Sequence, residues 1–215
     1  MSGAVTSRRR ARGTYRHGDL RRALLAAGIE LARAGGPDAV VLREATRRAG
    51  VVPNAAYRHF ASRDELLRAV RAAALSALAV AMETELAGRR RRRRAEDVAR
   101  DSLRAVGTAY LRFAQRETGL FRTAFSVGDD PERVSDPAMA GGSGLNPFQL
   151  LSSALDKMAE AGVLPPARRP GAEYLAWSAV HGFAMLVIEG PLRGFTSAQF
   201  EAIGQRVIDM VEKGL

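Results

Sequence analysis

Apolar residues recur at helical spacing along most of the chain. Leu20, Leu24, Ala27 and Leu31 recur at helical spacing, with arginines and Glu30 on the opposite side. This spacing predicts an amphipathic helix over about residues 17–34. From residue 95 to the end the pattern stays helical, and no run alternates as a half-buried strand would. The pattern therefore predicts an all-α protein.

The stretch from Leu42 to Phe60 contains two short helical patterns around a glycine. Gly50 stands where the chain must turn, and glycine adopts a positive φ without steric cost. Pro53 suits the first position of a new helix, where its missing N–H is not needed. Two helices joined by a short glycine-containing turn form a helix-turn-helix, whose second helix enters the DNA major groove. We expect the rest of the chain to position and regulate this unit.

Capping patterns mark where several later helices begin. Ser62 to Glu65 form an S-x-x-E box, Asn146-Pro147 begins another helix, and Thr196 with Gln199 forms a T-x-x-Q box. The expected helices after the helix-turn-helix cover about residues 62–87, 95–117, 120–125, 146–162 and 171–189, and from 196 to the end.

The helix over residues 171–189 is apolar on more than one side, which predicts burial between neighbours. The last helix is apolar on one face. The pair suits either the core of a bundle or a two-fold dimer interface, and the sequence leaves both open. The helix over residues 171–189 carries two apolar stripes, one of Tyr174, Trp177, His181, Ala184 and Ile188 and another of Leu175, Ala179, Gly182 and Leu186. The apolar face of the last helix carries Phe200, Ile203, Val207 and Met210.

Composition adds a charge argument. The net charge is +10 and the isoelectric point is about 11.1, which favours a polyanionic partner such as nucleic acid. With no cysteine, the chain has no disulfide and no cysteine-ligated metal. The most apolar segment, Ala176 to Ile188, is too short to span a bilayer, and the N-terminus has no apolar signal region. We expect a soluble, cytoplasmic protein without membrane contact.

These patterns divide the chain into three expected parts. Residues 1–16 form a basic arm, either a solvated tail or a segment lying along DNA. Residues 17–62 form the helix-turn-helix domain, and residues 63–215 a larger helical regulatory and dimerisation domain. The run from Arg89 to Arg94 is either a solvated loop or a contact to a distant phosphate.

One side of the second helix of the pair carries side chains suited to base contacts. Asn54 suits adenine, Arg58 suits guanine, and Ala55 suits a thymine methyl group. Arg43, near the start of the preceding helix, is a further candidate for a phosphate contact.

Three motifs stand at family-like spacing: LREATRRAGV from residue 42, NAAYRHF from residue 54 and SRDELL from residue 62. Through them, residues 17 to about 70 resemble the DNA-binding domain of TetR-type transcriptional regulators. Trp177 with His181-Gly182 is similar to the WHG-type C-terminal domain. The resemblance implies an all-helical homodimer, assembled through the last two helices, on a palindromic double-stranded DNA operator. It also implies a small, largely apolar effector in the C-terminal domain that lowers DNA affinity.

The resemblance adds Pro53, Tyr57, His59 and Arg63 as DNA contacts, the last three mostly to phosphate. The alternative is that Tyr57 packs on the first helix and His59 is only a surface residue. Val41 and Val52 depart from the family pattern, since Ser or Thr usually caps the helices there, and Thr46 replaces a usual alanine. A missing cap costs about 1 kcal/mol.

The effector pocket implied by the resemblance needs apolar walls and a few polar groups. Tyr110 and His181 are the polar candidates, and ordinary core packing is the alternative for each residue. The candidates are Tyr110, Phe113, Phe121, Phe125, Trp177, His181 and Met185.

Three function classes follow from these observations. The first is a ligand-responsive repressor released from its operator by a small molecule. The second is an architectural, non-specific nucleic-acid binder using the basic arm and the arginine run. The third is a helical enzyme, which ranks last because the three histidines are scattered and no catalytic pair or metal spacing appears. We expect no cofactor and no metal.

Overall fold

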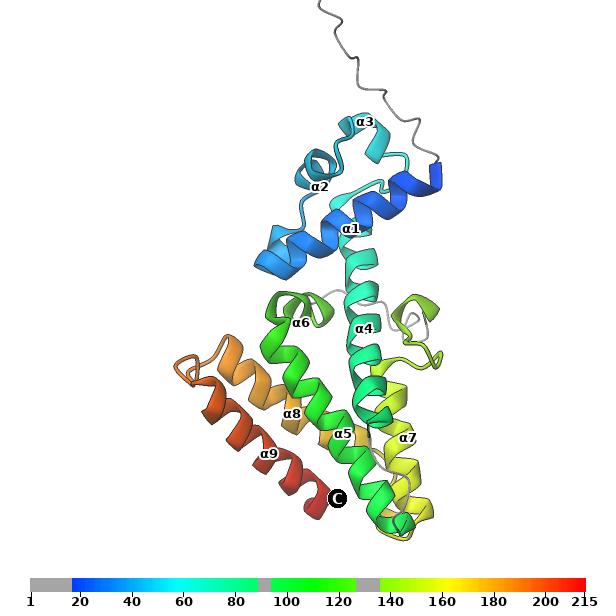
Figure 1. The fold of residues 1–215 in the computed structure, drawn as a ribbon, viewed down its shortest axis with the longest axis vertical. Coiled ribbons are helices and arrows are strands. Elements are labelled where there is room, and N and C mark those ends of the chain that lie inside the picture. Colours follow the sequence, from blue (N-terminus) through cyan, green and yellow to red (C-terminus); the bar gives the residue numbers. More distant parts are fainter. Residues whose placement is uncertain (1–16, 89–93, 127–135) are drawn as a thin grey trace, which may run out of the picture.

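The computed structural model describes residues 17–88, 94–126 and 136–215, so the predicted arm and Arg89–Arg93 lie outside the described residues. The described part is helical, without strands, as predicted (Figure 1). Short 3-10 turns η1, η3 and η4 occupy Pro37–Ala39, Pro137–Met139 and Pro166–Arg168. The helices are α1 (His17–Gly35), α2 (Leu42–Ala49), α3 (Pro53–Ala56), α4 (Arg63–Ala87), α5 (Ala95–Arg116), α6 (Thr118–Ala124), α7 (Pro147–Glu160), α8 (Ala172–Ile188) and α9 (Ser197–Gly214).

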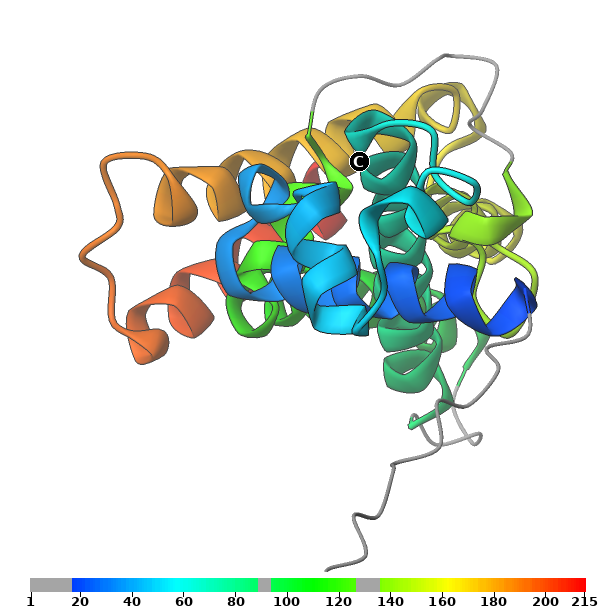
Figure 2. The same ribbon diagram turned by 90° about the horizontal axis from the view of Figure 1, so that it is seen from above.

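Helix α4 joins the two ends of the molecule. Figure 1 shows α1, α2 and α3 gathered at its start, while α7 lies along one flank of its second half and α8 and α9 lie on the other side, beyond α5. Viewed from above, α1–α3 lie over the remaining helices, and the connection from α8 to α9 projects to one side (Figure 2). A single apolar core runs from Leu24 on α1 through Leu66 on α4 to Ile208 on α9. The DNA-binding and regulatory parts therefore share one helix and one core.

The helix-turn-helix forms as the sequence predicts, but its second helix is shorter. Gly50 ends α2 in the left-handed conformation with φ of 68°. Helix α3 ends at Ala56, and the backbone N–H of Phe60 donates to the Ala56 carbonyl across a turn, at 3.0 Å. Phe60 is fully buried, with the guanidinium of Arg21 5.0 Å above its ring. Because the side chain of Phe60 lies in the core, the chain turns inward after Ala56, and α3 is therefore short.

The predicted caps of the longer helices are confirmed. Ser62 accepts a hydrogen bond from the backbone of Glu65 at the start of α4. Asn146 and Thr196 form complete capping boxes at the starts of α7 and α9. These reciprocal bonds satisfy backbone donors that a helix start leaves unpaired. The C-terminal helices therefore begin where the sequence places them.

The expectation that α8 is buried on nearly every side is wrong for a single chain. Its second stripe faces outward, since Leu175 is 65% exposed and Leu186 is 45% exposed. On α9, Met210 is 61% exposed, although it belongs to the predicted apolar face. The reason is that α8 packs on α5, α7 and α9, and these cover only part of its circumference. The sequence pattern records apolar surface without saying what covers it.

Candidate nucleic-acid interface and ligand cavity

Two of the three candidate base-contacting residues are exposed, and the third, Ala55, packs partly against the core. Asn54 and Arg58 are exposed, Ala55 is half-buried and Pro53 begins α3. Tyr57 is 56% exposed, so its ring is not packed away against α1 as the alternative interpretation required. His59 is half-buried. Asn54 lies on α3 and Arg58 in the turn that follows it, and exposed polar groups at these positions are what direct base readout needs.

Arg63 has a different environment from Arg58. Its Nε donates to the carbonyl of Val40 and its Nη2 to that of Pro37, each at 2.9 Å. The guanidinium therefore holds the connection between α1 and α2 against the start of α4. A phosphate contact by Arg63 would be made by a side chain that already orders the motif.

Helix α2 carries a dense set of charges on its exposed side. Glu44 pairs with Arg47 at 2.7 Å and with Arg48 at 3.1 Å, and Arg43 is exposed. Hydrogen bonds from Arg47 and then Arg48 lower the pKa of Glu44 to about 2. The carboxylate is therefore charged at all physiological pH values and orients two arginines beside the recognition segment.

Two departures from the family pattern have clear local consequences. Val41 occupies the position before α2 in an extended conformation and makes no side-chain cap. Thr46 is buried, and its hydroxyl donates to the carbonyl of Arg43 at 2.6 Å, so the polar group is satisfied inside the helix pair. Of these two positions, the start of α2 at Val41 is the less well stabilised, because it lacks a side-chain cap.

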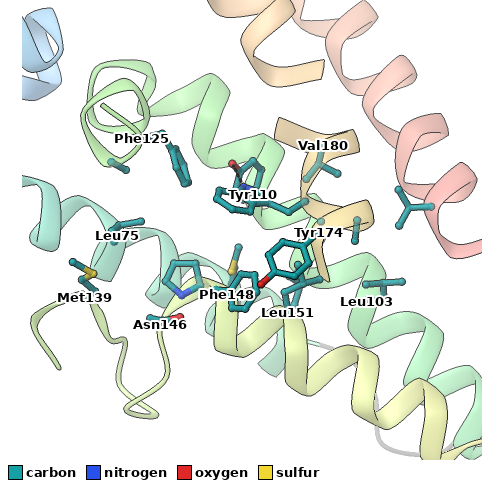
Figure 3. A pocket seen from close by; sticks show the side chains of 18 of the residues that line it. Leu75, Leu103, Tyr110, Phe125, Met139, Asn146, Phe148, Leu151, Tyr174 and Val180 are labelled. Atoms are coloured by element: carbon teal, nitrogen blue, oxygen red, sulfur yellow. Dashed lines mark hydrogen bonds between the residues drawn. The ribbon is translucent and has the colours of Figure 1, made fainter. Parts of the chain in front are cut away.

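The C-terminal part contains a partly open cavity of about 350 Å³ (Figure 3). Figure 3 shows Leu75, Phe125 and Met139 on one side of it and Leu103 on the other, with Phe148 and Tyr174 between. Its lining combines α4, α5, the end of α6, the segment around Met139, α7, α8 and α9. The lining residues are Arg71, Leu75, Met82, Leu103, Val106, Gly107, Tyr110, Ala124, Phe125, Met139, Asn146, Pro147, Phe148, Leu151, Tyr174, Ala176, Trp177, Val180, Ile208 and Val211.

Three of the seven predicted pocket residues line this cavity: Tyr110, Phe125 and Trp177. The other four are not among its lining residues. Phe121 and His181 lie behind the wall, where the Phe121 ring is edge-on to Tyr110 at 5.3 Å. Phe113 is buried on α5, and Met185 is half-buried on α8 one turn beyond His181.

A chain of hydrogen bonds fixes the aromatic wall. Trp177 Nε1 donates to the Tyr110 hydroxyl at 3.1 Å, and that hydroxyl lies 2.7 Å from His181 Nδ1. Burial raises the pKa of Tyr110 and lowers that of His181, so both groups are neutral. The hydroxyl accepts from Trp177, and in the His181 tautomer whose Nδ1 carries no proton it donates to that nitrogen. His181 thus positions Tyr110 from behind.

Sequence reasoning missed the wall formed by α4 and by residues 139–151. Met82 stands at helical spacing with Leu78 and Ala74, a pattern equally typical of core, and no sequence pattern marks Arg71 as a lining residue. Tyr174 was assigned to the stripe of Trp177 and His181, and that stripe was the one available signal. The remaining lining residues come from different helices and loops, and the sequence does not show that these elements lie close together in space.

Helix α6 connects the cavity to the DNA-binding part. Its end supplies Ala124 and Phe125 to the cavity, and the Ala124 carbonyl accepts from Arg71 Nε at 2.8 Å. Its start packs directly on α1, since a Cβ added at Gly119 would lie 2.3 Å from the carbonyl oxygen of Ala32. Beside it, Arg33 Nε bonds Glu117 at 2.8 Å. Helix α6 therefore contacts the cavity at one end and α1 at the other.

Family models match both parts of the chain. The model described as bacterial regulatory proteins, tetR family, matches residues 24–70. The model described as tetracyclin repressor-like, C-terminal domain, matches residues 103–211, which is half of the chain. The chain belongs to the TetR family. It is a DNA-binding helix-turn-helix regulator of transcription, so the enzyme alternative is excluded, and the predicted resemblance is confirmed.

Solved structures have the same TetR-family architecture. A protein of unknown function from a Rhodococcus species is 26% identical with a TM-score of 0.72, over 94% of this chain and 98% of that one. PfmR from Thermus thermophilus is 21% identical with a TM-score of 0.59, over 89% and 98%. FadR from Bacillus subtilis, solved with stearoyl-CoA, is 13% identical with a TM-score of 0.62, over 90% and 98%. The last two show the fold alone. No curated protein matches the sequence.

Two further findings concern partners. Among the described helices, none is long and apolar enough to cross a membrane. In the same part of the chain, no group of three or more His, Asp or Glu side chains is arranged to hold a metal ion.

Proposed function

We propose that this TetR-family regulator is a ligand-responsive repressor that binds a palindromic operator as a homodimer and leaves it when a small molecule fills the cavity. The observation that carries the proposal is the shared helix α4. One end of α4 packs against the helix-turn-helix, and Arg71, Leu75 and Met82 farther along it line the cavity. A ligand that favours one setting of α4 and α6 thereby changes DNA affinity, through a coupling of about 1–3 kcal/mol.

The exposed stripe of α8 supports dimerisation through α8 and α9. Leu175, Ala179, Gly182 and Leu186 recur at helical spacing on this face, and an added Cβ at Gly182 would meet nothing within 4 Å. Gly182→Gln therefore leaves the protomer intact. If a partner helix packs closely there, this variant is monomeric by sedimentation while the wild type is dimeric.

Selection of bound duplexes from a random DNA pool tests the repressor proposal. A dimer selects an inverted repeat whose half-sites lie about 34–36 Å apart for one helical turn. The double variant Asn54→Ala, Arg58→Ala is the matched control and selects no repeat. A featureless pool with the wild type contradicts the proposal and favours the architectural binder.

A further inference from the structure

Aromatic residues are concentrated in the lining of the cavity. Phe, Tyr and Trp make up 6% of the chain, whereas they are five of the twenty described residues that line the cavity. They come from elements far apart in the sequence, so the fold, and not one local pattern, brings the rings together. The five are Tyr110 on α5, Phe125 directly after α6, Phe148 on α7, and Tyr174 and Trp177 on α8.

These five rings form a continuous chain of contacts. The ring centroids of Tyr110 and Phe125 lie 5.8 Å apart, and the Phe125 centroid lies 5.9 Å from that of Trp177. Phe148 follows, 6.3 Å from Trp177 and 5.8 Å from Tyr174. Neighbouring ring planes are inclined by 46° to 74°, so none of these neighbours stacks face to face on the next. The chain of rings therefore keeps ring surface for a further aromatic partner.

The polar atoms of Trp177 and Tyr110 are bound within the protein. Trp177 Nε1 donates to the Tyr110 hydroxyl at 3.1 Å, and that hydroxyl lies 2.7 Å from His181 Nδ1. Phe125 and Phe148 have no polar side-chain atoms. Four of the five rings therefore offer a ligand their π surface, because their hydrogen-bonding atoms are either absent or already paired.

Resting on the proposed function, we propose that the effector is a planar molecule with fused aromatic rings, bound against Phe148, Trp177 and Tyr110. An aromatic pair gains more than burial alone, because the electron-rich face of one ring attracts the electron-poor edge of another. A saturated ring of the same size gains only from the burial of its apolar surface. Figure 3 shows Phe148 between Leu75 and Leu103, which places the fused rings in the middle of the cavity and leaves aliphatic contacts on either side for apolar substituents.

Two other interpretations of the aromatic lining explain the geometry less well. Rings that only fill a core are packed against other side chains, whereas these border about 350 Å³ of space. Aromatic faces also attract organic cations, which are bound where several rings surround one compact head. Here the rings follow one another from Tyr110 to Tyr174, which suits an extended flat molecule better than a compact cation.

Calorimetric titration with a matched pair of probes tests the proposal. The probes 2-naphthol and decahydro-2-naphthol share one carbon skeleton and one hydroxyl, are uncharged at neutral pH, and differ in aromaticity. The saturated probe has the larger apolar surface, so burial alone gives it no disadvantage. We expect 2-naphthol to bind at least about threefold more tightly, the effect of one aromatic pair. Equal or tighter binding of decahydro-2-naphthol, no binding of 2-naphthol, or tighter binding of tetraethylammonium, a compact cation, overturns the proposal.

Variants locate the aromatic contact. Phe148→Leu removes one ring from the lining and keeps an apolar side chain, so it should lower 2-naphthol affinity about threefold or more and change decahydro-2-naphthol binding much less. Leu103→Ile is the matched control, an aliphatic exchange that should leave the ratio of the two affinities unchanged. The phenolic hydroxyl of 2-naphthol is the stronger hydrogen-bond donor of the two. A preference that survives in a folded Phe148→Leu protein would therefore come from the hydroxyl and contradict the proposal.

Phe125→Leu repeats the test from the end of α6, at a half-buried position. The comparison of the two probes in the wild type depends on neither variant. These titrations contain no DNA, so a protein that prefers 2-naphthol but selects no inverted repeat retains the aromatic site and loses only the repressor proposal.

Discussion

The candidate DNA contacts of the helix-turn-helix lie between residues 43 and 63, whereas the cavity is lined by residues between 71 and 211. The recognition segment begins with a four-residue helix that exposes Asn54 and buries Ala56, and the buried ring of Phe60 anchors the segment behind it. The cavity is bounded by long helices whose side chains point inward. The surface contact site is thus formed by residues close together in the sequence. The cavity is formed by residues of elements far apart in the sequence, so its lining depends on how those elements pack together.

The largest effect distinguishing the two regions is expected at their anchors. Phe60→Ala removes a fully buried ring that fixes the end of the recognition segment, and should lower the free energy of unfolding by about 3–5 kcal/mol. Phe125→Ala, at the half-buried edge of an existing cavity, should cost clearly less, because fewer packing contacts are lost. Urea denaturation of both variants measures this, and equal losses would mean that the cavity edge is packed as tightly as the core.

A smaller effect separates two arginines of the DNA-binding part. Arg58→Ala should cost about 1–3 kcal/mol of operator affinity and relax specificity at one base pair, without changing stability. Arg63→Ala should also lower stability by about 1 kcal/mol, because it leaves the Pro37 and Val40 carbonyls without this donor. Operator titrations paired with thermal unfolding test both. If Arg58→Ala lowered stability and Arg63→Ala did not, the roles assigned to the two arginines would be the wrong way round.

The sequence predicted turns and helix starts well, in the helix-turn-helix and in the C-terminal part alike, because their signals are local. Gly50 has the positive φ that its position required, and the boxes at Asn146 and Thr196 begin their helices as expected. The early end of α3 was missed because it depends on where Phe60 meets the core. An apolar residue on α4, such as Leu75, can either pack against another side chain or line a cavity. Which of the two occurs depends on helices elsewhere in the chain, and the sequence of α4 alone does not show where those helices lie. For the same reason the sequence left open whether α8 and α9 form a bundle core or a dimer interface, and it did not show that one stripe of α8 lies outside the core of the protomer.

Caps give a reciprocal test of the two regions. Val41→Thr replaces a methyl group by a hydroxyl and keeps the shape of the side chain at the extended position before α2. The hydroxyl should accept a hydrogen bond from the backbone N–H of Glu44 and raise stability by about 1 kcal/mol. Thr196→Val removes the equivalent group before α9 and should lower stability by about the same amount. Chemical denaturation compares each with its alanine variant. No gain from Val41→Thr would mean that the start of α2 is already satisfied by other groups.

The smallest expected effect concerns the wall of the cavity and its dependence on pH. Burial lowers the pKa of His181 below its ordinary value of 6.5, so the unfolded chain binds a proton more readily than the folded one. Stability therefore rises with pH across this window. The contribution is fully present above about pH 6.5 and is lost as the pH falls through the lowered pKa. Protonation also removes the Nδ1 acceptor for the Tyr110 hydroxyl.

Comparison with His181→Asn isolates this contribution, because the amide oxygen keeps an acceptor near the Nδ1 position and does not titrate. Urea midpoints measured from about pH 7.5 down to about pH 5.5 should fall more steeply in the wild type than in the variant, and the two curves should run parallel above the window. Parallel curves throughout would mean that His181 is solvated in the folded protein, so that Tyr110 would lack the neutral acceptor that orients it. The Trp177 signal can be followed in the same titrations, so a change in the cavity wall would be detected before the chain unfolds.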